Sequence, residues 1–350
     1  MNSYQEGLGK MLVENDCVKT GMYRLFEDRS TPYIIDFERA LGRANPLARL
    51  ADMFHSKMTE SGLLSPDKPP FLIGNTLSGI PMAAAVAIEA YKHGQGTSGK
   101  GLDMRFGFFV KDEDIMTVAD AEETRKKLLK EYPGVKVLNT VTVRPTELRG
   151  EDLLTTGRLE AARILNFHSD VESIVASGYS GAPLAVSIAM AMRELGKDPY
   201  IAYERFSGRT YEPKAGSFFL GDVGNKSNVV IVRSSDRPAT VFYGNLQDND
   251  NVLIVDDIAA RESTLMGTVR KTVRQNPRAT ITGALVGVDK KEREGEKRLA
   301  DSLRISGMDL YSIITAEELL EMWHQFPDPE KRLSDEQHRI FLEYQRTNGY

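Results

Sequence analysis

The stretch Val252-Leu253-Ile254-Val255-Asp256-Asp257-Ile258-Ala259-Ala260-Arg261-Glu262-Ser263-Thr264-Leu265 decides the fold. Its first four residues are apolar and mostly β-branched, which is typical of a buried parallel strand. Two carboxylates follow where the strand ends, and a short polar loop then leads into a helix predicted from Leu265 onward. A strand, a polar loop and a helix N-terminus together predict an anion site at the carboxyl edge of an α/β sheet. The alternative is an ordinary buried strand that ends in a solvated acid pair.

The residue types in this stretch suit a phosphorylated sugar. Carboxylates can hold sugar hydroxyls or Mg²⁺, which takes oxygen ligands, and loop amides and hydroxyls can hold a phosphate. The stretch resembles the motif with which type I phosphoribosyltransferases, and orotate phosphoribosyltransferase above all, bind phosphoribosyl pyrophosphate (PRPP). The resemblance implies that Asp256 and Asp257 hold the ribose hydroxyls, with Mg²⁺ as the cofactor. It assigns the 5′-phosphate to the loop residues Ala260, Arg261, Glu262, Ser263 and Thr264.

The loop departs from the family pattern. The family has a Thr-Ala-Gly-Thr or Thr-Gly-Gly-Thr type of loop, whereas this chain has Ala260-Arg261-Glu262-Ser263. Glu262 stands where a small residue lets the backbone approach the phosphate, and a carboxylate there should repel that group. Arg261 could offset the repulsion or bind the anion itself in bidentate fashion. Alternatively, Glu262 turns away and caps the following helix.

A strand, a Ser-Gly-x-Pro turn and a helix occur twice, in residues 71–83 and in residues 174–185. Such a repeat indicates two copies of one supersecondary unit. The first turn resembles the family's pyrophosphate-side loop. The second turn supplies Tyr179, Ser180 and Gly181, which we assign to the pyrophosphate of PRPP.

The segment Leu138-Asn139-Thr140-Val141 aligns with Val255-Asp256-Asp257-Ile258, with neutral residues in place of the acid pair. We therefore predict an α/β, parallel-sheet, Rossmann-like fold of the type I phosphoribosyltransferase kind, built from two tandem units. Residues 1–150 form a small N-terminal hood and a degenerate unit. Residues 151–350 form the unit with the PRPP motif. The alternative is one catalytic domain with an inserted unit.

Two further segments resemble functional parts of the family. Residues 1–40 combine a helix with two short strands, like the hood of orotate phosphoribosyltransferase, and Lys19 falls on its substrate-facing lysine. Residues 203–216 stand where the family has its flexible catalytic loop, and they carry Arg205 and Arg209. A basic loop over a pyrophosphate leaving group would stabilise developing charge. The alternatives are a solvated strand lysine and a solvated surface loop.

Composition excludes several other classes of protein. The chain has 350 residues, of which 27% are charged and 41% hydrophobic, as in ordinary globular proteins. A net charge of −5 does not indicate the basic surface typical of nucleic-acid-binding proteins. Cys17 is the single cysteine, so an intrachain disulfide is excluded. No apolar run is long enough to span a membrane, and the N-terminus does not resemble a signal peptide, so we expect a cytoplasmic location. The five histidines occur in no context typical of a Ser-His-Asp triad.

Three functions remain open. The first is a phosphoribosyltransferase of pyrimidine nucleotide metabolism that transfers phosphoribose from PRPP to an orotate-like base and releases pyrophosphate. It would act as a homodimer or as an internal pseudo-dimer. The second is a catalytically inactive binding or scaffold protein that has kept the fold. The third is an enzyme that acts on another phosphorylated ribose.

Overall fold

The computed structural model describes most of the chain. The described residues are 3–24, 30–65, 68–76, 78–98, 101–109, 121–143, 149–204, 219–220, 228–234, 242–243, 246–259, 262–291, 293–294 and 297–348.

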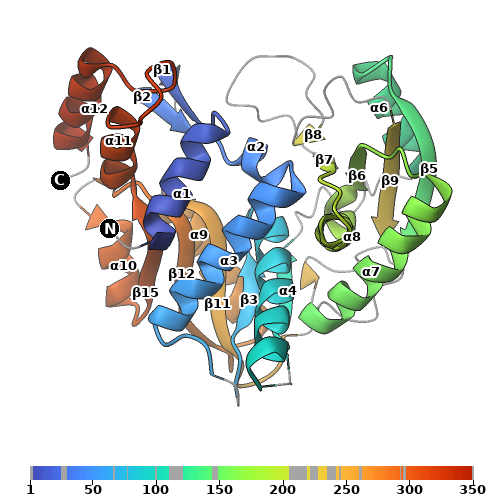
Figure 1. Cartoon of the computed structure of the whole chain (residues 1–350). Coiled ribbons are helices and arrows are strands. Elements are labelled where there is room, and N and C mark those ends of the chain that lie inside the picture. Colours follow the sequence, from blue (N-terminus) through green and yellow to red (C-terminus); the bar gives the residue numbers. More distant parts are fainter. Residues whose placement is uncertain are drawn as a thin grey trace.

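The first sheet has the strand order β10-β4-β3-β11-β12-β15 (Figure 1). Its strands are β3 (Phe71–Gly74), β4 (Phe106–Phe109), β10 (Phe242–Tyr243), β11 (Asn251–Ala259), β12 (Thr280–Asp289) and β15 (Asp309–Thr315). All neighbours pair in parallel except β10 and β4. The apolar run of β11, residues 252–255, is at most 1% exposed, because the neighbouring strands and the helices cover it on all sides.

The second sheet has the strand order β5-β9-β6-β7-β8. Its strands are β5 (Lys136–Val143), β6 (Ser173–Ser177), β7 (Tyr200–Glu204), β8 (Phe219–Leu220) and β9 (Asn228–Ser234). Here too every pair is parallel except the last, β7 with β8. Two largely parallel sheets with helical connections confirm the predicted α/β class and the presence of two units.

Four helices lie between the two sheets: α3 (Ala44–Glu60), α4 (Gly79–Ser98), α7 (Gly150–Phe167) and α8 (Gly178–Glu194). They belong to one cluster of buried side chains that includes Leu253 of the first sheet and Val230 of the second. Close packing depends on small residues, since a Cβ on Gly157 of α7 would lie 2.4 Å from the carbonyl oxygen of Ser187 on α8. The two units therefore share one continuous core.

Eight further elements complete the described part of the chain outside the hood. They are α2 (Glu38–Leu41), α6 (Ala121–Glu131), α9 (Glu262–Gln275), β13 (Arg293–Glu294), β14 (Lys297–Arg298), α10 (Leu299–Ile305), α11 (Ala316–His324) and α12 (Asp335–Asn348). None of the helices in the described part of the chain has the length and apolar character needed to cross a bilayer.

The hood forms as predicted. Helix α1 (Ser3–Glu14) precedes an antiparallel hairpin of β1 (Val18–Arg24) and β2 (Ser30–Ile35). The C-terminal helices hold it in place, because the Gln337 side-chain amide donates to the Thr20 hydroxyl and the Lys331 ammonium donates to the Glu14 carbonyl oxygen. The N-terminal hood and the helices α11 and α12 thus lie side by side (Figure 1).

The strand pairing differs from the predicted division at residue 150. Strands β3 and β4 come from the N-terminal part of the chain, yet β3 pairs with β11, the strand of the acid pair. Strands β5 to β9, residues 136–234, form the second sheet by themselves. The pairing corresponds to the alternative interpretation, in which one unit is inserted into another, because a local repeat does not specify which distant strands become neighbours.

The strand equivalent to β11 also differs from the prediction. In the second sheet β9 lies beside β6, as β11 lies beside β3, whereas residues 138–141 lie in the edge strand β5. Gly79 and Gly181 occupy the same position in the two repeated turns, so β3 and β6 are equivalent strands. The register of β3 with β11 and that of β6 with β9 then make Val232 the equivalent of Val255. It follows that Arg233 and Ser234 occupy the positions of the acid pair.

Candidate functional site

The acid pair lies at the carboxyl end of β11, in the middle of the first sheet. Asp256 is 3% exposed, whereas Asp257 is partly exposed. The Thr76 hydroxyl donates to one carboxylate oxygen of Asp256 at 2.6 Å, and the Asn75 side-chain amide donates to the other. The Asp257 carboxylate accepts from the Ile258 backbone N–H at 2.8 Å. Asp256 is therefore locked in place, and Asp257 is the more exposed residue of the pair.

The turn between β3 and α4 forms the adjoining wall of the site. The backbone N–H of Asn75 donates to the Val255 carbonyl oxygen at 3.0 Å, which ties the turn to β11. Gly79, the first residue of α4, comes so close that an added Cβ would lie 2.6 Å from the same oxygen. Only glycine allows this approach, and it brings the N-terminus of α4 to the acid pair.

Helix α9 closes the site from the other side. The Thr268 hydroxyl donates to the Asn75 side-chain oxygen, so that Thr268, Asn75 and Asp256 form a chain of hydrogen bonds. The helix begins at Glu262, within the predicted phosphate loop and earlier than the start predicted at Leu265. Two helix N-termini, those of α4 and α9, thus flank one carboxyl edge of the sheet, where their positive ends favour anions.

The hood reaches the same edge. The Lys19 ammonium lies 2.8 Å from the Asp36 carboxylate, and Phe37 comes next in the chain. A Cβ on Gly287 of β12 would lie 2.8 Å from the Phe37 ring and 2.9 Å from the Asp257 carbonyl oxygen. The segment that holds Lys19 is therefore packed beside the acid pair.

Burial shapes the protonation of both carboxylates. It raises the pKa of Asp256, and burial together with the negative charge of Asp256 raises the pKa of Asp257 well above its usual range. Between the usual aspartate pKa of about 3.9 and these higher values, the folded protein binds more protons than the unfolded chain. The free energy of unfolding therefore falls as pH rises through this interval. A cation or a set of sugar hydroxyls bound to the two carboxylates would offset this loss of stability.

We expect Asp257→Asn to raise the melting temperature at pH 7, because the substitution removes a buried negative charge beside that of Asp256. A gain of 1 kcal/mol corresponds to about 2–4 °C for a domain of 150–250 residues. Calorimetry between pH 4 and 8 would also show a weaker decline of stability with pH. Asp301→Asn, on the exposed pair with Arg304, is the control and should change neither property. A lower melting temperature of Asp257→Asn at pH 7 would contradict this account.

No protein-family model matches the sequence. Several curated proteins do match it, and these are named orotate phosphoribosyltransferase. The protein of Legionella pneumophila is 26% identical over 173 residues, which cover 49% of this chain and 69% of that protein. The protein of Clostridium acetobutylicum is 25% identical over 45% of this chain and 60% of its own length. The protein of Pyrococcus furiosus is 26% identical over 36% of this chain and 74% of its own length.

The chain resembles the orotate phosphoribosyltransferases. This confirms the resemblance to type I phosphoribosyltransferases that the motif predicted. Among solved structures, the orotate phosphoribosyltransferase of Francisella tularensis has a TM-score of 0.48 at 12% identity, over 97% of this chain and 95% of that one. The enzyme of Aeropyrum pernix has a TM-score of 0.39 at 16% identity, over 90% of this chain and 97% of that one.

The predicted site residues fall into three groups. Asp256, Asp257 and Lys19 belong to the first sheet and its hood. Tyr179, Ser180 and Gly181 lie at the start of α8, in the turn that follows β6 of the second sheet. The last group is not described in the structure: Arg205, Arg209, Ala260 and Arg261 lie outside the described residues, as do the side chains of Glu262, Ser263 and Thr264 at the start of α9.

The turn beside the acid pair is that of β3 and α4, not that of β6 and α8. Sequence analysis therefore missed Asn75, Thr76 and Thr268 as partners of the pair. The sequence does indicate a second candidate turn, because Ser78 and Gly79 repeat the Ser180 and Gly181 of the second copy. What the repeat could not specify was which of the two turns lies next to β11.

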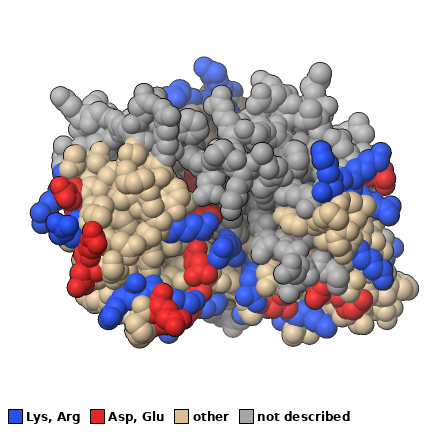
Figure 2. Space-filling model, turned by 90° about the horizontal axis from the view of Figure 1, so that it is seen from above, with Lys and Arg blue, Asp and Glu red and all other residues tan. Residues whose placement is uncertain are grey.

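Charges are mixed on the face seen in Figure 2. Lysines and arginines alternate with aspartates and glutamates along the described edge of this face. The pattern is that of an ordinary solvated surface.

Proposed function

We propose that the protein is a phosphoribosyltransferase that uses PRPP and an orotate-like nitrogenous base. The observation that carries the proposal is the acid pair of β11, anchored by Asn75 and Thr76 between two helix N-termini. Carboxylates accept hydrogen bonds from the ribose hydroxyls, while the helix ends and the loop after β11 favour the phosphate groups. One edge of one sheet thus offers both kinds of contact that PRPP requires.

In this reaction the C–O bond to pyrophosphate breaks with its electron pair, and a nitrogen of the base bonds to the same anomeric carbon. Positive charge develops on the ribose, and no side chain need act as a nucleophile. Asp256 and Asp257 would orient the ring and stabilise that charge, while Arg205 and Arg209 would stabilise the departing pyrophosphate. Lys19 would meet the base from the hood.

The residues at this edge also suit Mg²⁺. The donor set consists of oxygen atoms, which Mg²⁺ prefers, and the raised pKa values of the two carboxylates favour a bound cation. Asp257, with its partly exposed carboxylate, would hold the ion directly or through water. Bound Mg²⁺ would neutralise charge on the pyrophosphate.

The inserted unit supports an internal pseudo-dimer. Counting thirteen residues on from the equivalent glycines Gly79 and Gly181 gives Lys92 and Glu194, and these two side chains pair with each other at 3.3 Å. Contact between equivalent positions is a property of a two-fold interface. A homodimer would place two like charges there, whereas this chain has opposite ones.

We expect one PRPP to bind per chain. At the equivalent edge of the second sheet Arg233 and Ser234 replace the acid pair, and an arginine has no acceptor for a ribose hydroxyl. Isothermal titration of the full chain with PRPP and Mg²⁺ gives the stoichiometry directly. Two equal sites per chain would overturn the assignment of the second unit as degenerate.

The same preparation tests turnover. Release of pyrophosphate should depend on PRPP, Mg²⁺ and a base, and orotate should be the best of a panel that includes uracil, adenine and nicotinate. Binding of PRPP without release on any base would favour the inactive binding protein, which the Ala260–Ser263 loop also supports. Absence of PRPP binding would remove the proposal.

A further inference from the structure

A second polar cluster lies on the neighbouring helices α3 and α4, away from the acid pair. Asp52 and His55 stand three residues apart on α3, and Glu89 and His93 stand four residues apart on α4. Residues at these spacings share one face of a helix. Each helix therefore presents one carboxylate and one imidazole to the other.

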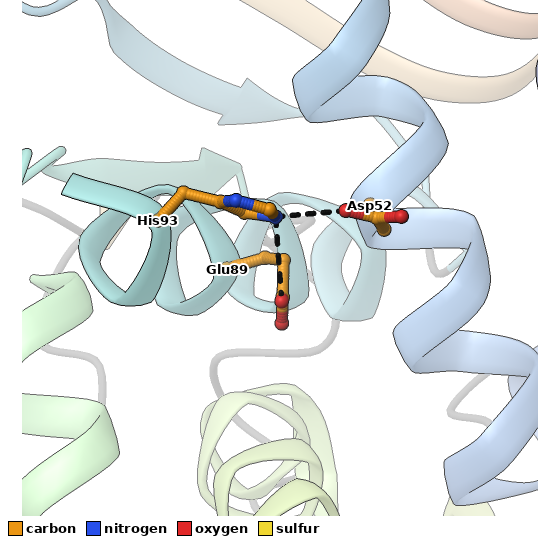
Figure 3. Close-up of side chains that lie close together, drawn as sticks. All are labelled: Asp52, Glu89 and His93. Atoms are coloured by element: carbon orange, nitrogen blue, oxygen red, sulfur yellow. Dashed lines mark hydrogen bonds and ion pairs between the residues drawn. The ribbon is translucent and has the colours of Figure 1, made fainter. Parts of the chain in front are cut away.

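The three side chains drawn in Figure 3 converge on one point. His93 Nε2 lies 2.8 Å from Asp52 Oδ1 and 3.7 Å from Glu89 Oε1. One nitrogen and two oxygens of these residues all lie within 4.8 Å of one another. The His55 ring stacks on that of His93, with centroids 4.4 Å apart and planes at 5°.

These distances are similar to the separations between the ligand atoms of a bound transition-metal ion. Zinc binds imidazole nitrogen and carboxylate oxygen at about 2.0–2.2 Å, so two tetrahedral ligand atoms lie about 3.3 Å apart. The separations of 2.8 and 3.7 Å lie on either side of this value. The third separation, between the Asp52 and Glu89 oxygens, is within 4.8 Å, so an ion at the centre needs side-chain shifts of up to about 1.5 Å.

Two carboxylates, Asp52 and Glu89, share one imidazole nitrogen in this cluster. Glu89 is 14% exposed, and Lys92 binds its Oε2 atom at 3.2 Å, so that Oε1 is the oxygen directed at His93. A proton on His93 Nε2 can be donated strongly to only one carboxylate at a time. A divalent ion would neutralise both Asp52 and Glu89 and let the imidazole bind as a neutral ligand.

We propose that Asp52, Glu89 and His93 form a site for a divalent transition-metal ion of the zinc class. The fourth position faces solvent and takes a water molecule, with the stacked His55 ring beside it. The imidazole ligand favours zinc, cobalt or nickel over Mg²⁺, which prefers oxygen, so this site is distinct from the acid pair. The ion joins α3 to α4, and Lys92 continues the contact to Glu194 on α8.

Titration of the full chain with Co²⁺, and then with Zn²⁺, tests the proposal. Bound Co²⁺ should give a visible absorption band that one equivalent of Zn²⁺ removes. His93→Ala and Glu89→Gln should each weaken Zn²⁺ binding by at least about tenfold, since even residues that only support metal ligands contribute 10–100-fold. Two variants guard against a folding defect in either one.

Two controls make the result specific. His338→Ala removes a ring from the other stacked pair, His324 and His338 on α11 and α12, whose centroids lie 4.1 Å apart. Asp257→Asn alters the acid pair. Both should bind Zn²⁺ like the wild type. Equal Zn²⁺ affinity in His93→Ala and the wild type, or loss of binding in either control, would overturn the site.

Discussion

Replacement of Asp256 and Asp257 by asparagine together is expected to weaken PRPP binding by about two to four orders of magnitude. Each carboxylate contributes a charge-assisted hydrogen bond to a ribose hydroxyl or to Mg²⁺, worth about 1.5–3 kcal/mol, and about 1.4 kcal/mol corresponds to a factor of ten. Pyrophosphate release at saturating PRPP should fall as well, because the pair also stabilises the charge that develops on the ribose. Titration calorimetry and a pyrophosphate assay measure the two effects separately.

The matched control is Ser234→Ala, at the equivalent position of the second sheet. It should leave both measurements unchanged, because the second unit lacks the acid pair. The expected loss must also come without unfolding, and Asp257→Asn alone is expected to melt at a higher temperature than the wild type. Wild-type PRPP affinity in the double variant would remove this edge of the sheet from the mechanism.

The sequence was sufficient where local patterns determine structure. The run of residues 252–255 predicted a buried strand, because four consecutive apolar side chains suit a strand covered on both faces. The hood followed from a helical pattern and two short strands around a polar turn, all within the first 40 residues. The similarity to orotate phosphoribosyltransferases followed from one motif.

The sequence was insufficient where two segments of the chain could each be the equivalent of β11 in the second sheet. Residues 138–141 and β9 both precede a polar loop, and only the pairing of β9 with β6 identifies β9 as the equivalent of β11. A signal existed, since Asn228-Val229-Val230-Ile231-Val232 closely matches Asn251-Val252-Leu253-Ile254-Val255. The match alone does not show that the chain leaves the first sheet after β4 and returns to it at β10.

The site partners were missed for a related reason. Asn75 and Thr76 are common turn residues, and their role depends on the parallel register that places Gly74 beside Val255. That register is a non-local property of the sheet. The same holds for the cluster of Asp52, Glu89 and His93, whose members are ordinary charged residues until α3 and α4 pack together.

Arg261→Ala is expected to reduce PRPP affinity by about ten- to a hundredfold. The variant loses a bidentate, charge-assisted contact worth about 1.5–3 kcal/mol. Arg261→Lys keeps the charge but not the planar fork, so an intermediate affinity would identify the bidentate contact.

Glu262→Gln separates the two roles that the sequence left open for this residue. Because α9 begins at Glu262, a carboxylate there stabilises the helix dipole by about 0.3–1 kcal/mol. If the carboxylate acts only on the helix, Glu262→Gln should lower the melting temperature slightly and leave the PRPP affinity within about threefold of the wild-type value. If the carboxylate instead faces the phosphate, the same change removes a repulsion of about 4 kcal/mol and tightens binding about a thousandfold. The position of Glu262 at the start of the helix favours the first result, in which Arg261 alone compensates for the altered loop and the phosphate site remains functional.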